Sequence, residues 1–93
     1  MTYNLRFHCA ALKEWEKLGH TVREQFKKKL RERLELPHVP KDALRGLTDH
    51  YKIKLKASGY RLVYRVEADH VAVLVLSVGK RERGEAYEMA SKR

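Results

Sequence analysis

The sequence is poor in the residues that would mark several classes of protein. It has one cysteine, Cys9, so an internal disulfide is impossible and a thiolate-rich zinc site lacks its ligands. No run of about 18 or more apolar residues could cross a membrane. The first residues also lack the charged segment and apolar segment of a signal peptide. These absences predict a protein of the reducing cytoplasm that has no membrane association.

Acidic residues are scarce relative to basic ones. The chain has 21 Lys and Arg against 12 Asp and Glu, which leaves a formal net charge of +9. For a small domain this charge is typical of a nucleic-acid binder, although a basic surface can also serve solubility or attract an acidic protein. The hydrophobic content of 43% is sufficient for a folded core, and we expect residues 1–93 to form a single domain.

Hydrophobic periodicity predicts a strand followed by a helix at the start of the chain. Residues 2–7 alternate apolar and polar side chains, as a half-buried strand does. The helix that follows presents an apolar face formed by Leu12, Trp15 and Leu18, and we expect it to end at Gly19.

A second amphipathic helix is expected directly after the first. Thr21 and Glu24 have the spacing of a capping box, which predicts the start of this helix. It should stop before Pro37, because the residue before a proline disfavours helical geometry. Two helices joined by such a short connection predict an antiparallel helical hairpin.

Three strands and a short helix complete the predicted fold. The strands are expected over residues 51–55, 60–66 and 71–78, with Gly59 in a hairpin turn between the first two. Residues 82–93 predict a short C-terminal helix. The order βααβββα indicates an α+β fold, in which an antiparallel sheet carries the helical hairpin on one face.

Strand alternation gathers cations on one face of this sheet. Lys52 and Lys54 share a face, and a hairpin places Arg61 and Arg65 of the next strand on the same side. Residues 51–66 contain five Lys and Arg and no acidic residue. Because like charges on neighbouring strands repel, this pattern predicts a bound anion such as RNA. The alternative is an edge strand that its lysines protect from aggregation.

Further candidate residues lie near the C-terminus and on the second helix. Arg81 follows the last strand in a basic turn, whereas Lys80 and Arg83 beside it are expected mainly to be solvated. Tyr87 has the chemistry to stack on a base or reach a phosphate, although packing of the terminal helix is the alternative. The lysines at 27–29 form either a solvated helix face or a secondary phosphate-contact surface for a large RNA. The histidines show no metal-ligand spacing, and no metal or cofactor is expected.

Six short motifs, spread along the whole chain, are shared with one known family. They are ALKEW (11–15), TVREQ (21–25), LRG (44–46), YKIKL (51–55), SGYRLVY (58–64) and SVGKRER (77–83). Through these motifs, of which the last three are the most specific, the chain resembles the RelE toxins of RelE–RelB type II toxin–antitoxin systems. The resemblance implies the RelE/ParE-like fold for residues 1–93 and an endoribonuclease that cuts mRNA in the A site of the 70S ribosome, against the small-subunit rRNA. It also implies a RelB-type antitoxin that wraps the toxin and displaces its C-terminal helix.

The resemblance also implies which residues carry the activity. The catalytic positions of the family match Lys52, Lys54, Arg61, Arg81 and Tyr87. Additional RNA contacts are expected from Arg45, Arg65, Lys80 and Arg83.

These residues suit the cutting of RNA by its own 2′-hydroxyl. A lysine acts as a base only when its pKa is lowered, and Lys52 and Arg61 would lower the pKa of Lys54 by like-charge repulsion. Lys52 and Arg61 can then hold the phosphoryl oxygens, while Arg81 stabilises charge on the leaving oxygen and Tyr87 positions the nucleotide. This chemistry requires no metal. Two other functions remain open: a non-catalytic RNA-binding protein, and a toxin of the same fold that poisons gyrase.

Overall fold

The structure is a computed structural model that describes residues 2–80 and residue 92. Its elements are β1 (Asn4–Phe7), α1 (Cys9–Glu16), α2 (His20–Glu35), the 3-10 turn η1 (Pro40–Asp42), β2 (His50–Leu55), β3 (Tyr60–Glu67), the 3-10 turn η2 (Ala68–His70) and β4 (Ala72–Lys80). The order of strands and helices over these residues is the predicted one. The helix predicted over 82–93 lies outside the described residues except for residue 92.

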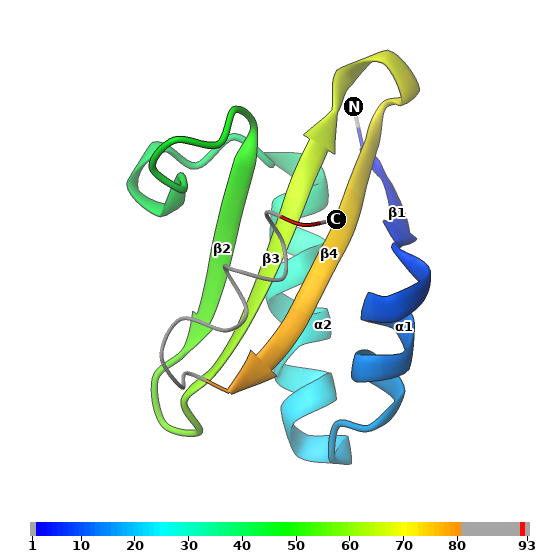
Figure 1. The fold of residues 1–93 in the computed structure, drawn as a ribbon, viewed down its shortest axis with the longest axis vertical. Coiled ribbons are helices and arrows are strands. Elements are labelled where there is room, and N and C mark those ends of the chain that lie inside the picture. The colour runs from blue at the N-terminus through cyan, green and yellow to red at the C-terminus, as the bar shows by residue number, and fades with distance from the viewer. Residues whose placement is uncertain (1, 81–91, 93) are drawn as a thin grey trace.

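The four strands form one sheet in the order β1-β4-β3-β2 (Figure 1). The β2, β3 and β4 strands are antiparallel to their neighbours, as predicted, but β1 runs parallel to β4. The sheet is therefore mixed, and the prediction of a wholly antiparallel sheet is wrong for this one pair. The alternation of residues 2–7 predicts a strand and its buried face but carries no information on the direction of the neighbouring strand.

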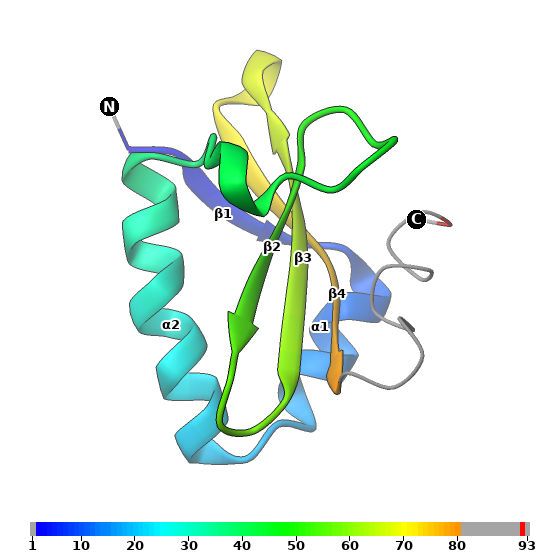
Figure 2. The same ribbon diagram turned by 90° about the vertical axis from the view of Figure 1, so that its left-hand side faces the viewer.

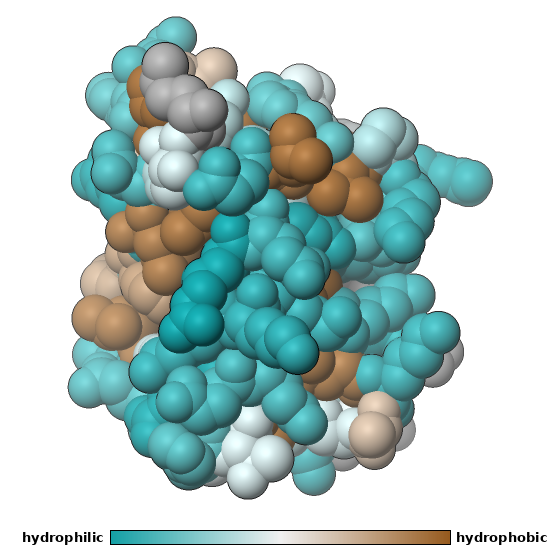
Figure 3. All heavy atoms as spheres, turned by 180° about the vertical axis from the view of Figure 1, so that it is seen from behind, coloured by the Kyte–Doolittle hydropathy of each residue, from teal (hydrophilic) through white to brown (hydrophobic). Residues whose placement is uncertain are grey.

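Both helices pack their apolar side chains against the same face of the sheet, as predicted. In Figure 1, α2 lies behind the strands, and Figure 2 shows it to one side of the sheet; Figure 3, seen from behind, shows a mostly hydrophilic surface with smaller hydrophobic patches. The core joins Trp15 of α1 and Phe26 of α2, whose ring centroids are 6.3 Å apart, to Phe7 of β1, 5.3 Å from Trp15. Leu12 was expected in this core but is 43% exposed, because Ala11 and Trp15 form the buried stripe of this eight-residue helix.

The predicted starts and ends of the helices are partly wrong. The second helix begins at His20, so Thr21 lies within its first turn, and no side chain caps it. The capping box is therefore not formed, and Gly19, expected to end the first helix, is the N-cap residue of α2. The prediction that this helix stops before Pro37 is confirmed, since α2 ends at Glu35.

The strand β4 is buried on both faces, as its continuous apolar sequence predicts. Val73 and Val75 join the core beneath the helices, whereas Leu76 contributes to a smaller apolar cluster on the opposite face. The register between β3 and β4 shifts between Val63 and Tyr64, so that Leu76 is the extra residue of a bulge. Within residues 2–80 and 92, no helix is both long and apolar enough to span a membrane.

Candidate nucleic-acid interface

The β2–β3 hairpin brings the predicted basic residues together on the sheet face opposite the helices. Lys54 lies directly across from Arg61, and Lys52 lies across from Val63. Opposed residues of an antiparallel pair have Cβ atoms about 5 Å apart, so Lys54 and Arg61 are close neighbours of like charge. Lys52, two residues before Lys54, projects from the same face. Arg65, which lies across from His50, is on this face too, so the shared face predicted for the four cations is confirmed.

A shallow hollow lies at the end of this hairpin. It has a volume of about 300 Å³ and is lined by Lys54, Leu55, Lys56, Gly59, Tyr60 and Arg61. Gly59 has a φ of +76°, the left-handed conformation expected of a glycine in this turn. Gly79 of β4 stands opposite Arg61 and adds no side chain to this part of the face. The hollow thus offers an anion two cations from the strands and a third from the turn.

A partly buried hydrogen-bond network anchors the strand that carries Lys52. Nη1 of Arg33 donates to the backbone oxygen of Lys52, at 3.3 Å, and to the hydroxyl of Tyr64, at 3.0 Å. Nη2 of Arg33 bonds to Oδ2 of Asp42 at 2.5 Å, and the Tyr64 hydroxyl donates to the oxygen of Pro37 at 2.7 Å. This network ties α2, η1 and β3 to the edge of β2, so it fixes the position of Lys52.

Burial and the charged partners shift the pKa values of Tyr64 and Arg33 in opposite directions. Burial raises the pKa of Tyr64 above its ordinary value, although the hydrogen bond and charge of Arg33 act to lower it. For Arg33, burial acts to lower the pKa, but the hydrogen bonds and charges of Tyr64 and Asp42 raise it overall. Arg33 is therefore a permanent cation of the structure, held in place by its partners.

Sequence reasoning missed an apolar cluster within the basic face. Val63 lies between the cations of β3 and is fully buried together with Leu76, while Leu44 and Leu74 pack against this pair. The backbone nitrogen of Leu44 donates to the oxygen of His50 at 2.9 Å, which fastens the segment after η1 to the edge of β2. The signal for this cluster in the sequence is Val63, an apolar residue between Arg61 and Arg65 on the same face of β3.

The other candidate RNA contacts lie at different places. Arg45 follows Leu44 and is exposed. Arg65 forms an ion pair with Glu67 at 3.0 Å, so its charge is compensated by an acid directly after the acid-free segment. Nζ of Lys80, at the end of β4, is 5.6 Å from the centroid of the Tyr60 ring, a cation–π distance.

Three of the predicted residues cannot be placed, because Arg81, Arg83 and Tyr87 lie outside the described residues. Over the part of the chain that is described, no group of three or more His, Cys, Asp and Glu residues could hold a metal ion.

Two helices on one face of a mixed sheet and a basic β-hairpin on the other face define a small α+β protein with a cationic surface. Comparison with known proteins narrows this description. A family model described as the ParE toxin of the type II toxin–antitoxin system parDE matches residues 5–84. The mRNA interferase toxin RelE of Escherichia coli strain K12 is 61% identical over 93 residues, which cover 100% of this chain and 98% of that protein.

Solved structures agree with this comparison. A mutant of E. coli toxin RelE in the free state has a TM-score of 0.93 and 59% identity, covering 100% of this chain and 98% of the other. The toxin of the intact E. coli RelBE toxin–antitoxin complex has a TM-score of 0.84 and 62% identity, covering 87% and 99%. The chain therefore belongs to the RelE/ParE family of type II toxin–antitoxin toxins.

Proposed function

We propose that this chain is the toxin of a type II toxin–antitoxin system and that it acts as an endoribonuclease, cutting mRNA in the ribosomal A site. The observation that carries the proposal is the register that sets Lys54 opposite Arg61 and beside Lys52, in a chain 61% identical to a named mRNA interferase. The cationic face favours a polyanionic ligand, and the relative is named for its action on mRNA. An RNA strand therefore fits both observations.

The proposed reaction is attack of an RNA 2′-hydroxyl on the adjacent phosphorus. Lys54 accepts the proton of the 2′-hydroxyl, the bond between the 2′-oxygen and phosphorus forms, and the bond from phosphorus to the 5′-oxygen breaks. The products are a 2′,3′-cyclic phosphate and a 5′-hydroxyl, whose proton comes from water. Arg61 and Lys52 hold the phosphoryl oxygens while their negative charge increases.

The remaining roles rest on the family resemblance. Arg81 stabilises charge on the leaving 5′-oxygen, because an arginine does not release its proton readily enough to act as an ordinary acid. Tyr87 positions the nucleotide by stacking or by hydrogen bonding. Exposed Arg45, with Lys80, Arg83 and the partly compensated Arg65, supplies contacts to RNA phosphates.

This site contains no histidine–carboxylate pair among its proposed residues, so we infer that the ribosome must align the substrate for attack. The partners are then mRNA, the small-subunit rRNA at the decoding site of the 70S ribosome, and a RelB-type antitoxin that covers the toxin. The place of action is the cytoplasm, and residues 1–93 act as a single domain without a cofactor.

Cleavage of an unstructured mRNA fragment, with and without programmed ribosomes, tests this proposal. We expect weak cleavage of the free RNA and rapid cleavage on ribosomes, with cuts inside codons. Equally rapid cleavage in both would contradict ribosome dependence, and no cleavage in either would contradict the enzyme. In that last case, retained RNA binding would indicate a non-catalytic RNA-binding protein, and inhibition of gyrase would indicate the other toxin activity of this fold.

A further inference from the structure

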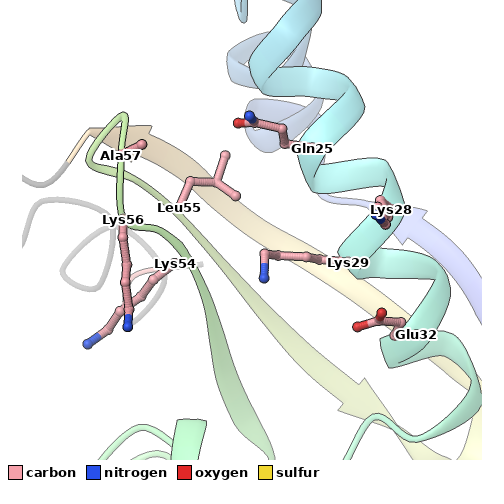
Figure 4. Close-up of a pocket in the computed structure, with 8 residues that line it drawn as sticks. All are labelled: Gln25, Lys28, Lys29, Glu32, Lys54, Leu55, Lys56 and Ala57. Carbon is pink, nitrogen blue, oxygen red and sulfur yellow. The ribbon is translucent and has the colours of Figure 1, made fainter.

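A second, larger hollow lies between α2 and the end of β2 (Figure 4). Its volume is about 450 Å³, and we call it the α2–β2 cleft. It is lined by Gln25, Lys28, Lys29 and Glu32 of α2, and by Lys54, Leu55, Lys56 and Ala57 of β2 and the turn after it. In Figure 4, Lys29 reaches from α2 toward the strand, whereas the side chains of Lys54 and Lys56 extend away from α2, on the other side of β2.

The lining of this cleft is strongly basic. The residues that line it include four lysines and one acid, Glu32, a formal excess of three positive charges. All four lysines are exposed, so solvent and ligands reach them. On the same helix, Nζ of Lys27, which does not line the cleft, lies 3.5 Å from a carboxylate oxygen of Glu24. An excess of one charge around one hollow favours a polyanionic ligand.

The cleft continues directly into the hollow of the candidate site. Lys54, Leu55 and Lys56 line both, so the two hollows meet at the end of β2. A chain of phosphates that passes Arg61 and Lys54 on the sheet face would therefore reach Lys56 and then Lys29 on α2. A strongly charged polymer suits this arrangement better than a small anion, which would fill only one of the two hollows.

We propose that the α2–β2 cleft binds the phosphodiester backbone of the same RNA strand that is cut, at nucleotides next to the scissile phosphate. Lys28 and Lys29 are the residues that the cleft adds to the site. Lysines are flexible point charges, which suits contacts that hold a strand without reading its sequence. The proposal rests on the proposed function, since it assumes that RNA occupies the face of Lys54 and Arg61.

The test measures the binding of 2′-O-methyl RNA, which lacks the attacking hydroxyl, so that the wild-type toxin can be used uncut. The variant is K28Q/K29Q, because glutamine has a similar helix propensity and an unbranched polar side chain while removing two charges. The matched control is K13Q/K17Q, which removes two charges from exposed positions on and directly after α1. Thermal unfolding confirms that both variants fold.

For a long oligonucleotide, we expect K28Q/K29Q to bind more weakly and to reduce the slope of log K against log salt by about 1.4, or about 0.7 per lost phosphate contact. The control should keep the wild-type slope. For a trinucleotide, which can occupy the candidate site alone, K28Q/K29Q should bind as the wild type does. An unchanged slope for the long oligonucleotide, or equal weakening for both lengths, would overturn the proposal.

Cleavage on programmed ribosomes separates this inference from the proposed function. If the wild-type toxin cleaves mRNA on ribosomes but K28Q/K29Q binds the long oligonucleotide as tightly as the wild type does, only the inference about the cleft is contradicted. Absence of wild-type cleavage would contradict the function, whatever the binding data show. If K28Q/K29Q lost affinity for ribosomes but kept that for the long oligonucleotide, the lysines would contact ribosomal RNA and the assignment to the substrate strand would be wrong.

Discussion

The two faces of the sheet differ in their side chains: one is apolar and packs against the helices, and the other carries basic residues. On the helix side, Ile53, Leu62 and Tyr64 are fully buried in one apolar core. On the opposite side, neighbouring positions of the same strands present Lys54 and Arg61. Alternation along a strand thus separates the residues that stabilise the fold from those proposed to act on RNA. A substitution should therefore affect folding or activity according to the face on which it lies.

The separation has two exceptions: the buried pair Val63 and Leu76 on the basic face, and the network around Arg33. The network begins among buried groups on the helix side, at the hydroxyl of Tyr64, and ends on the backbone of Lys52. Hydrogen bonds therefore connect the two faces at one position of the edge strand, Lys52. The predictions below test first the separation and then this connection.

The largest effect is expected from removing the proposed base on the open face. Lys54→Ala should lower the rate of mRNA cleavage on programmed ribosomes by about 10²- to 10⁴-fold, the usual contribution of a general base. Lys54→Arg keeps the charge but cannot release a proton at neutral pH, so it should lose nearly as much. Both variants should unfold at the same urea concentration as the wild-type protein, since Lys54 is exposed. Full activity of Lys54→Arg would mean that the residue supplies charge alone.

A substitution on the helix side should have the opposite effect. Leu62→Ala, in the strand that also carries Arg61, removes a fully buried side chain and should lower the free energy of unfolding by about 2–5 kcal/mol. Urea unfolding measures this loss. The rate of cleavage per folded molecule should stay near that of the wild type at low temperature. A selective loss of that rate would show that the two faces are not separated.

The connection between the faces is tested at Arg33. Arg33→Met leaves Asp42 without its cation and the oxygen of Lys52 without its donor, so stability should fall by about 2 kcal/mol. Cleavage by the folded protein should also fall, by roughly tenfold, because the strand of Lys52 is less well positioned. Arg31→Met, an exposed change on the same helix, should alter stability by less than about 0.5 kcal/mol. Lost stability with unchanged cleavage by Arg33→Met would limit Arg33 to a structural role.

The smallest effect is expected from the buried tyrosines at high pH. Burial raises the pKa of Tyr64, and burial together with the carboxylate of Asp49 raises that of Tyr51. Below about pH 10 these tyrosines are protonated in the folded and unfolded chains, and their contribution to stability is complete. As the pH rises further, the unfolded chain ionises first, so the free energy of unfolding falls.

Tyr64→Phe removes one of these groups. Above about pH 10, its free energy of unfolding should fall less steeply than that of the wild type, by up to about 1.4 kcal/mol per pH unit. Urea unfolding between pH 8 and 11 gives the two slopes, and only the slopes are compared, because the variant also lacks the hydrogen bonds of the hydroxyl. Parallel curves would show that Tyr64 does not contribute to the pH dependence.

Much of the fold follows from local patterns in the sequence. The alternation of residues 51–55 and 60–66 predicts two strands and their faces, and the structure confirms both because each strand has one face on the helices. The direction of β1 and the start of α2 were not predictable in the same way. The first depends on the strand beside it, and the second on the conformation of Gly19, neither of which side-chain periodicity reports.

The candidate site was predictable where it depends on alternation alone. Lys52, Lys54 and Arg61 lie together as expected, because the hairpin register follows from the turn at Gly59. The support from Arg33 was not visible, since it joins residues 19 positions apart through a backbone oxygen. For the α2–β2 cleft, the sequence shows only the lysines at 27–29, which fit either a solvated helix face or a phosphate-contact surface. The distance from Lys29 to β2 depends on how the helix packs.

Mapping the ends of mRNA fragments tests the central claim most directly. Cells that briefly express the wild-type chain are compared with cells that express Lys54→Ala at the same level. We predict new 5′ ends inside codons of translated messages for the wild type, and none above background for Lys54→Ala. Intact messages in the presence of folded wild-type protein, or the same cuts from both chains, would contradict the claim that this face of the sheet cuts mRNA.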